Sequence, residues 1–232
     1  MIVSMWMTRN PLVVTESVSI AVAANLMATR KIRRLPVVEL DVTRPTMVGI
    51  ISSTDILHAY APDVNPFGTR PEAGARGYVV GDVMTRNPLS TTPETPIEEV
   101  ARILREKKIG ALPVVQGNGL VGIITESDIF RAFISVMGAD RGGVRLTFDL
   151  SKDEDALTFL TSLARRFNVR IASLMTSSYE GKDLGVLRVY GENLEPFVDS
   201  LWDSGHRVLS VLDQRLEPKR EGPKDPKKEL KR

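Results

Sequence analysis

The sequence Leu-Pro-Val-Val occurs twice, at residues 35–38 and again at 112–115, a spacing of 77 residues (112 − 35). At the same spacing, the hexapeptide Met-Thr-Arg-Asn-Pro-Leu stands at 7–12 and again at 84–89. Two blocks repeated in one order at one spacing indicate an internal duplication. The chain therefore carries one structural unit twice.

A third block limits the length of the unit. Val-Gly-Ile-Ile at 48–51 returns at 121–124, a spacing of 73 residues (121 − 48), because the loop before it is four residues longer in the first copy. One unit of about 55 to 60 residues buries only a marginal core by itself. We therefore expect the sheets of the two copies to pack together as a pseudo-two-fold pair.

Each copy has the pattern strand, helix, strand, strand, helix, in which the branched apolar runs named above predict buried strands. Apolar residues at i, i+3, i+4 and i+7 predict a helix around 20–27 and another around 97–104. The stripe residues are Ile20, Ala23, Ala24 and Met27 in the first copy and Ile97, Val100, Ala101 and Leu104 in the second. Thr95, Pro96 and Glu98 predict a capping box at the start of the second helix.

A different element order follows Gly142-Gly143. The hydrophobic pattern predicts strand, helix, strand, strand, helix and strand, in the segments 144–150, 153–167, 169–176, 184–190, 194–204 and 207–212. This β-α-β-β-α-β order is that of the ferredoxin-like fold. The expected fold class is therefore α/β in the repeats and α+β in the C-terminal region.

The composition restricts the function classes. The 232 residues include no Cys and two His, which excludes disulfides, thiolate metal sites and a Cys nucleophile and gives no basis for a His metal centre. The tail at 213–232 carries eight Lys or Arg against five Asp or Glu but no aromatic residue, so it predicts disorder rather than nucleic-acid binding. No apolar stretch is long enough to span a bilayer, and we expect a cytoplasmic protein.

Each copy ends on Gly-x-x-Ser/Thr-x-x-Asp, which places Ser52 before Asp55 and Thr125 before Asp128 where a strand runs into a helix. Free N–H groups and the helix dipole at such a junction favour a phosphate, which a hydroxyl can also contact. The carboxylate can accept hydrogen bonds from a ribose diol, and the glycine lets a ligand approach the backbone. The pattern predicts a nucleotide site in each copy.

A structural explanation of the same residues stays open. Asp55 and Asp128 are also good helix N-caps, and Ser or Thr often precedes a helix without a ligand. His58 and Arg131, one turn after the two aspartates, can face either a phosphate or solvent. We expect no catalysis, because no nucleophile and base can be paired and no P-loop or dinucleotide motif is present.

On the Met-Thr-x-x-Pro opening, the Leu-Pro-Val-Val strand and the Gly-x-x-Ser/Thr-x-x-Asp ending, the chain resembles a tandem pair of cystathionine β-synthase (CBS) domains, a Bateman module. Members of that family bind AMP, ADP, ATP or S-adenosyl compounds between the repeats, and some bind nothing. The resemblance implies that Asp55 and Asp128 hold ribose and that Ser52 and Thr125 hold phosphate. It places adenine beside the opening segments, at Leu12, Val14, Leu89 and Thr91.

The order of domains resembles the acetoin-utilisation regulatory type, in which an ACT-like domain follows the CBS pair. ACT domains often bind amino acids through a Gly after their first strand. The corresponding loop at 150–155 has no Gly, so we expect a coupling or dimerising role. The implied boundaries are CBS repeats at 1–60 and 78–138, a linker at 61–77, an ACT-like domain at 144–212 and a disordered charged tail at 213–232.

The expected function is that of a sensor of AMP, ADP or ATP that acts as a homodimer on an unidentified regulated protein. The alternatives are a constitutive dimeric scaffold without nucleotide and a sensor of S-adenosyl compounds. The two pockets are expected to differ, because Arg33 and Arg34 of the first copy are replaced by Gly110 and Ala111 in the second. An arginine at a pocket would favour a phosphorylated ligand over adenosine. The sequence leaves open whether these arginines face solvent, their own pocket or the neighbouring one.

Overall fold

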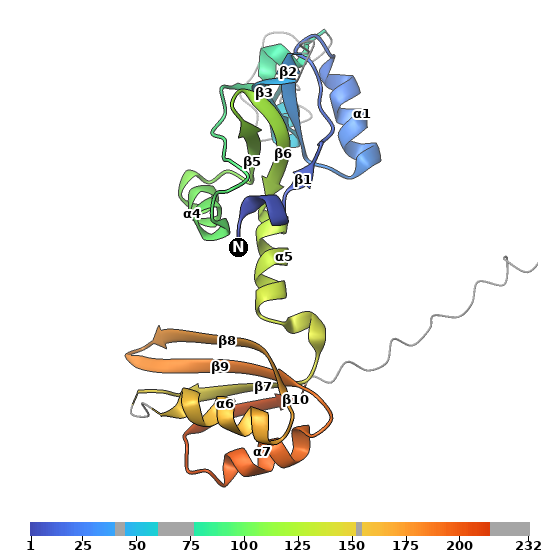
Figure 1. Ribbon diagram of the computed structural model, residues 1–232. Coiled ribbons are helices and arrows are strands. Elements are labelled where there is room, and N and C mark those ends of the chain that lie inside the picture. Colours follow the sequence, from blue (N-terminus) through green and yellow to red (C-terminus); the bar gives the residue numbers. More distant parts are fainter. Residues whose placement is uncertain (40–44, 60–76, 152–154, 214–232) are drawn as a thin grey trace, which may run out of the picture. The chain divides into compact units, whose positions relative to one another are not determined.

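The computed structural model describes residues 1–39, 45–59, 77–151 and 155–213. The chain divides into two compact units, Met1–Arg131 and Ala132–Arg232 (Figure 1). Residues 61–76 of the expected linker and the tail from residue 214 lie outside the described residues, as do residues 152–154 of the loop compared above with ACT domains.

Both copies have the predicted order of elements. The first contains β1 (Thr8–Arg9), α1 (Ile20–Arg30), β2 (Arg34–Glu39), β3 (Thr46–Ser52) and α2 (Ser53–Ala59). The second contains β4 (Thr85–Arg86), α4 (Ile97–Lys107), β5 (Ala111–Gln116), β6 (Gly119–Thr125) and α5 (Glu126–Val136). A short helical turn precedes each copy, η1 (Val3–Met5) in the first and α3 (Val80–Val83) in the second.

The apolar stripes of α1 and α4 face the core as predicted. Three of the four stripe residues on each helix are buried: Ile20, Ala23 and Met27 on α1, and Ile97, Val100 and Leu104 on α4. Tertiary packing of this apolar face therefore stabilises α1 and α4.

Across the described ranges of the chain, every helix is too short or too polar to cross a membrane.

The predicted capping box at Thr95 and Glu98 is wrong. Helix α4 starts at Ile97 without a side-chain cap from the described residues, and the Thr95 hydroxyl accepts a hydrogen bond from the N–H of Thr92 at 3.3 Å. The N–H of Ile97 donates to the carbonyl of Met1 at 3.1 Å. A backbone group from the other copy has taken the place of a local cap, and local spacing cannot reveal such a partner.

One six-stranded sheet joins the two copies. The hairpins β2–β3 and β5–β6 meet where Thr46 of β3 pairs with Gly119 of β6. The opening strands are exchanged, because β1 pairs with β6 of the second copy and β4 pairs with β3 of the first. Both hairpins shift register at equivalent places, after Val37 and after Val114. Each copy therefore gives its opening strand to the hairpin of the other, and the two copies form a pseudo-two-fold pair.

The exchange explains the glycine in each Val-Gly-Ile-Ile block. A β-carbon at Gly49 would lie 2.5 Å from Sδ of Met84, and one at Gly122 would lie 2.7 Å from Sδ of Met7. Neither glycine is among the described residues that line the cavities below. The expectation that they make room for a ligand is therefore wrong: they admit the opening segment of the other copy.

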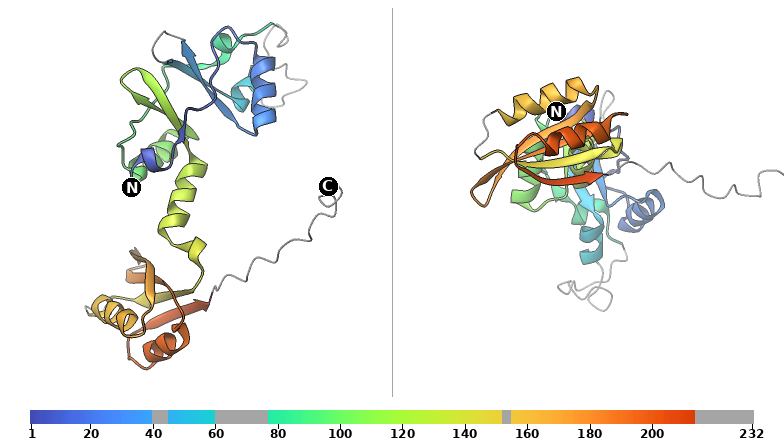
Figure 2. Two further views of the ribbon diagram at one scale, coloured as in Figure 1. Left: turned by 45° about the vertical axis from the view of Figure 1, so that its right-hand side comes forward. Right: turned by 90° about the horizontal axis from the view of Figure 1, so that it is seen from below.

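The second unit is a four-stranded antiparallel sheet with two helices on one face (Figure 1, Figure 2). Its elements follow the predicted order: β7 (Val144–Asp149), α6 (Ala156–Arg166), β8 (Arg170–Tyr179), β9 (Lys182–Tyr190), α7 (Leu194–Trp202) and β10 (Val208–Asp213), after the 3-10 turn η2 (Ala139–Arg141). The strands lie in the order β10-β7-β9-β8. Phe148 of β7 and Phe197 of α7 are fully buried between the sheet and the helices.

Candidate functional site

Two cavities lie where the two copies meet in the first unit. The larger has a volume of about 650 Å³ and is here called the Asp55 cavity. Its lining comes from Arg34, Ile50, Ser52, Thr54 and Asp55 of the first copy and from Thr85, Asn87, Pro88, Leu89, Lys107, Lys108, Ile109, Gly110 and Ala111 of the second. The end of one copy thus faces the opening segment of the other.

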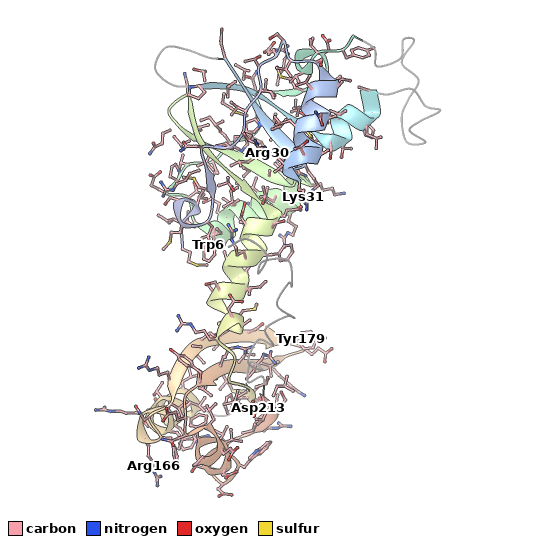
Figure 3. The ribbon with its side chains drawn as sticks, turned by 90° about the vertical axis from the view of Figure 1, so that its right-hand side faces the viewer. Trp6, Arg30, Lys31, Arg166, Tyr179 and Asp213 are labelled. Atoms are coloured by element: carbon pink, nitrogen blue, oxygen red, sulfur yellow. The ribbon has the colours of Figure 1, made fainter. Side chains whose placement is uncertain are left out.

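The second cavity, called the Asp128 cavity, has a volume of about 430 Å³. Its lining comes from Ile123, Thr125, Ser127 and Asp128 of the second copy and from Thr8, Asn10, Pro11, Leu12, Lys31, Ile32, Arg33, Arg34 and Pro36 of the first. Lys31 follows the last turn of α1 (Figure 3). The two cavities are therefore equivalent under exchange of the copies.

The hydroxyl and the carboxylate of each motif bind one another. The N–H and Oγ of Ser52 both donate to Oδ2 of Asp55 at 2.7 Å, and Oγ accepts the N–H of Asp55 at 3.2 Å. Thr125 and Asp128 repeat these bonds at 2.9, 2.7 and 3.4 Å. Each pair is a capping box. The structural explanation, that these residues cap a helix, therefore applies. The N-cap is the hydroxyl residue, however, and not the aspartate that was expected in that place.

Most backbone donors at these helix starts are already used. The N–H of Ser53 donates to the carbonyl of Arg33 at 2.9 Å, and the N–H of Glu126 donates to the carbonyl of Gly110 at 3.3 Å. The capping boxes engage the N–H groups on either side. The expectation of several free N–H groups for a phosphate is therefore wrong, and side chains must supply most of the donors.

Thr54 and Ser127 are the hydroxyl residues that sequence reasoning missed. Each lines a cavity directly before an aspartate and is exposed. Within the described part of the chain, neither hydroxyl has a hydrogen-bond partner, whereas the hydroxyls of Ser52 and Thr125 are held in the capping boxes. Adjacency to the aspartate was the signal that could have identified them.

The opening blocks also supply lining residues that sequence reasoning missed. Asn10 and Asn87 both have a φ of 46°, in the left-handed region that asparagine adopts more readily than most residues. Each is followed by a proline that lines the same cavity. The signal was the duplicated Met-Thr-Arg-Asn-Pro-Leu block, which repeats a loop sequence and not only a core sequence.

The structure places the predicted site residues in two groups. Those that line a cavity are Leu12, Arg33, Arg34, Ser52, Asp55, Leu89, Thr125 and Asp128. Val14 and Thr91 are buried and form single bridges to Val37 and Val114, outside the linings. His58 and Arg131 also lie outside both linings.

Arg131 is engaged by its own helix and by the opening segment. Its guanidinium donates to Oδ1 of Asp128 at 2.8 Å and to the carbonyl of Trp6 at 3.0 Å. His58, the corresponding residue of the first copy, is exposed on α2. Arg131 therefore acts on the aspartate itself and not on a group inside the cavity.

Cationic side chains outnumber carboxylates in both linings. Arg34, Lys107 and Lys108 surround the Asp55 cavity, and Lys31, Arg33 and Arg34 surround the Asp128 cavity. Burial and the neighbouring Arg33 lower the pKa of Arg34, whereas Glu126 and Asp55 act in the opposite direction. An arginine stays protonated at neutral pH, so each lining carries three cations against one carboxylate.

Two copies of a β-α-β-β-α unit that share a sheet, exchange their opening strands and enclose two cavities define a tandem repeat module. The family profile of the CBS domain matches residues 3–62 and 80–135, together half of the chain. The chain belongs to the CBS domain family and carries the domain as a tandem pair.

Related proteins share this pair in different contexts. The CBS domain-containing protein CBSX2, chloroplastic, of Arabidopsis thaliana is 33% identical over 143 residues, which are 53% of this chain and 59% of that protein. The inosine-5'-monophosphate dehydrogenase of Thermoplasma acidophilum is 34% identical over 122 residues, which are 52% of this chain and 21% of the enzyme. The chain therefore spans less than two thirds of either relative.

Solved structures resemble the chain over similar stretches. The crystal structure of CBSX2 in complex with AMP is 34% identical, with a TM-score of 0.47, and covers 57% of this chain and 96% of that one. The protein of Vibrio cholerae named for acetoin utilization (AcuB) is 30% identical, with a TM-score of 0.49, over 61% and 96%. The CBS domain pair of MJ0100, in complex with 5'-methylthioadenosine and S-adenosyl-L-methionine, is 28% identical, with a TM-score of 0.47, over 57% and 95%.

Proposed function

We propose that this protein is a non-catalytic regulator that binds AMP, ADP or ATP in the cavities between its CBS domains. The observation that carries the proposal is the excess of cations, three against one carboxylate in each lining. A concave surface with such an excess attracts a polyanion. Arginine adds planar donors that match phosphate oxygens in pairs.

The remaining lining suits the nucleoside part of such a ligand. Leu12 and Ile32 offer apolar surface in the Asp128 cavity, and Leu89 and Ile109 do so in the Asp55 cavity. The aspartates can accept hydrogen bonds from ribose hydroxyls, and the exposed hydroxyls before them can donate to phosphate oxygens. Both volumes fall in the range of about 300–1,000 Å³ that is usual for small-molecule sites.

The same charge balance separates nucleotides from S-adenosyl compounds. S-adenosylmethionine carries a sulfonium and an ammonium against one carboxylate, so its net charge has the sign of the cavity lining. Like charges within a few ångströms oppose binding. Phosphorylated adenosine is therefore the better match, while a scaffold that binds neither remains the alternative from another class.

Calorimetry and thermal unfolding with AMP, ADP, ATP and S-adenosylmethionine test the proposal. A nucleotide at 100 times its dissociation constant should stabilise the fold by about 2.7 kcal/mol, and its affinity should fall as salt is added because screening weakens the charged contacts. Lys108→Ala should weaken binding, whereas Lys182→Ala on β9, outside both linings, is the matched control. Silence with all four compounds at millimolar concentration would favour the scaffold.

We also propose that the C-terminal sheet is a ferredoxin-like domain of ACT type with a coupling or dimerising role, as in the acetoin-utilisation type of regulator. The β-α-β-β-α-β order and the strand order β10-β7-β9-β8 support this assignment. A thermal shift with each of the common amino acids tests the role, since stabilisation by any one of them would instead indicate an amino-acid sensor.

An exposed apolar face on α5 supports self-association. Phe130, Phe133 and Ile134 follow the i, i+3, i+4 spacing of one face of α5, and all three are exposed. Apolar patches of this kind are usually covered by a partner, and a two-fold homodimer is the commonest closed assembly. Light scattering should report twice the 25.6 kDa chain mass, and Phe133→Asp should reduce it. A wild-type monomer at micromolar concentration contradicts the proposal.

A further inference from the structure

Arg34 holds a position that no other described residue holds, because it lines both cavities. It is the first residue of β2, and its backbone pairs with Ser52 at the end of β3. The equivalent position in the second copy is Ala111, which pairs with Thr125 in the same way. The duplication therefore provides two equivalent backbone positions, one in each copy, but only the position in the first copy holds an arginine.

The guanidinium of Arg34 reaches across to the second copy. A β-carbon at Gly110 would overlap this guanidinium, and it would lie 3.0 Å from Oε2 of Glu126. Gly110 is the counterpart of Arg33, so the space that the second copy leaves empty is occupied by a cation from the first. A second arginine in this space would bring two like charges together.

The described residues do not fix the guanidinium in this position. Within the described part of the chain it has no hydrogen bond or ion pair, although Asp55 and Glu126 stabilise its charge from a distance. Its five N–H donors are therefore available. The side chain can turn toward either cavity without breaking a bond to these residues.

We propose that Arg34 is one phosphate ligand shared by two cavities, so that a phosphate bound in one cavity withdraws it from the other. This inference rests on the proposed nucleotide function and adds that phosphorylated ligands fill the two cavities with negative cooperativity. A guanidinium makes its strong paired contacts with one phosphate at a time. The second phosphate then binds without the arginine and near another anion.

Titration calorimetry with AMP and with adenosine tests the inference. For AMP we expect two steps whose dissociation constants differ by about tenfold beyond the statistical factor, within the usual range of coupling between sites. For adenosine, which has no phosphate, the two steps should differ less than for AMP, because only the intrinsic difference between the cavities remains. Arg34→Ala should weaken the first AMP step but leave the second nearly unchanged, because the second phosphate already binds without the arginine. The excess over adenosine should therefore disappear, while adenosine binding stays nearly unchanged.

Two further variants separate charge from position. Arg33→Ala is the matched control, because Arg33 lines the Asp128 cavity but not the Asp55 cavity. This variant should weaken one AMP step and preserve the coupling between the cavities. Gly110→Ala keeps the charge of Arg34 but displaces its guanidinium, so it should reduce the coupling. Circular dichroism and the unfolding midpoint verify that each variant is folded.

The outcomes separate this inference from the proposed function. Equal coupling for AMP and adenosine, unchanged coupling in Arg34→Ala, or equal weakening of both AMP steps in Arg34→Ala overturns the shared arginine while nucleotide binding stands. One bound AMP but two bound adenosines per chain supports it as complete withdrawal, whereas one of each overturns it. No binding of AMP, ADP or ATP overturns the proposed function and this inference with it.

Discussion

The Asp55 and Asp128 cavities share one backbone frame and differ in the charged side chains placed on it. The capping boxes, the left-handed asparagines and the register shifts recur in both copies. These features fit each copy to the exchanged opening segment of the other. A substitution at such a position in one copy therefore requires a compensating substitution in the other. The charged lining differs at Arg33 and Arg34, whose counterparts in the second copy are Gly110 and Ala111.

The aspartates show the difference most clearly. Asp128 is 7% exposed, and its Oδ1 accepts a hydrogen bond from Arg131 at 2.8 Å. Asp55 is half-buried, and its Oδ1 has no hydrogen-bond partner among the described residues. One carboxylate oxygen is therefore available for a ligand hydroxyl in the Asp55 cavity, while the equivalent oxygen in the Asp128 cavity is shared with a guanidinium.

The largest effect is expected from the two glycines that admit the exchanged methionines. Alanine normally stabilises a strand relative to glycine, but Gly49→Ala and Gly122→Ala should each destabilise the fold by about 1–3 kcal/mol through overpacking. The contacts with Met84 and Met7 are nearly equal, so the two costs should agree within about 0.5 kcal/mol. Urea unfolding measures both.

A double variant controls this prediction. Met84→Ala removes the side chain that a β-carbon at Gly49 would meet. Gly49→Ala with Met84→Ala should therefore cost less than the sum of the two single changes, because the contact with Met84 is absent in the double variant and only the approach to the Thr85 carbonyl, at 3.1 Å, remains. Additive costs would show that Met84 is not the cause of the destabilisation, and a cost at one glycine alone would show that the frames of the two copies are not equivalent.

Removal of the capping hydroxyls should have the next largest effect. Ser52→Ala and Thr125→Ala should each lower the free energy of unfolding by about 1 kcal/mol in the absence of ligand, because each deletes an N-cap. Thr125→Ser keeps the hydroxyl and should stay close to the wild type. Ser53→Ala, at an exposed neighbour, should change stability by less than about 0.5 kcal/mol. Unchanged stability in both alanine variants would contradict the capping role of these hydroxyls.

Much of the fold could be predicted from the sequence because its signals are local. The duplicated blocks and the helical stripe that starts at Ile20 predict the elements of each copy, and apolar periodicity predicts the order in the C-terminal unit. The exchange of opening strands could not be predicted. It depends on which segments meet after folding, as the cap of α4 by the carbonyl of Met1 shows.

The candidate site was predicted in part for the same reason. The paired Ser and Asp residues stand out because both copies keep them, and they do line the cavities. Their bonds to each other could not be predicted, because the same spacing serves a capping box and a ligand site equally well. The position of Arg34 between the cavities follows from the empty space at Gly110, which appears only when the copies are paired.

The smallest effect distinguishes the surroundings of the two aspartates. Arg131→Ala should lower the free energy of unfolding by about 0.5–1 kcal/mol, a value reduced by solvent screening because the Arg131 side chain is 61% exposed. His58→Ala should have almost no effect, since His58 is exposed on α2. Chemical unfolding of both variants, in the absence of nucleotide, measures the difference.

A pair of double-mutant cycles assigns that difference to the carboxylates and not to the helices. Arg131→Ala combined with Asp128→Asn should show a coupling of about 0.5 kcal/mol or more, because the two side chains are hydrogen-bonded at 2.8 Å. His58→Ala combined with Asp55→Asn should be additive. Equal couplings in the two cycles would mean that both aspartates are held alike, and the free oxygen of Asp55 would then no longer distinguish the two cavities.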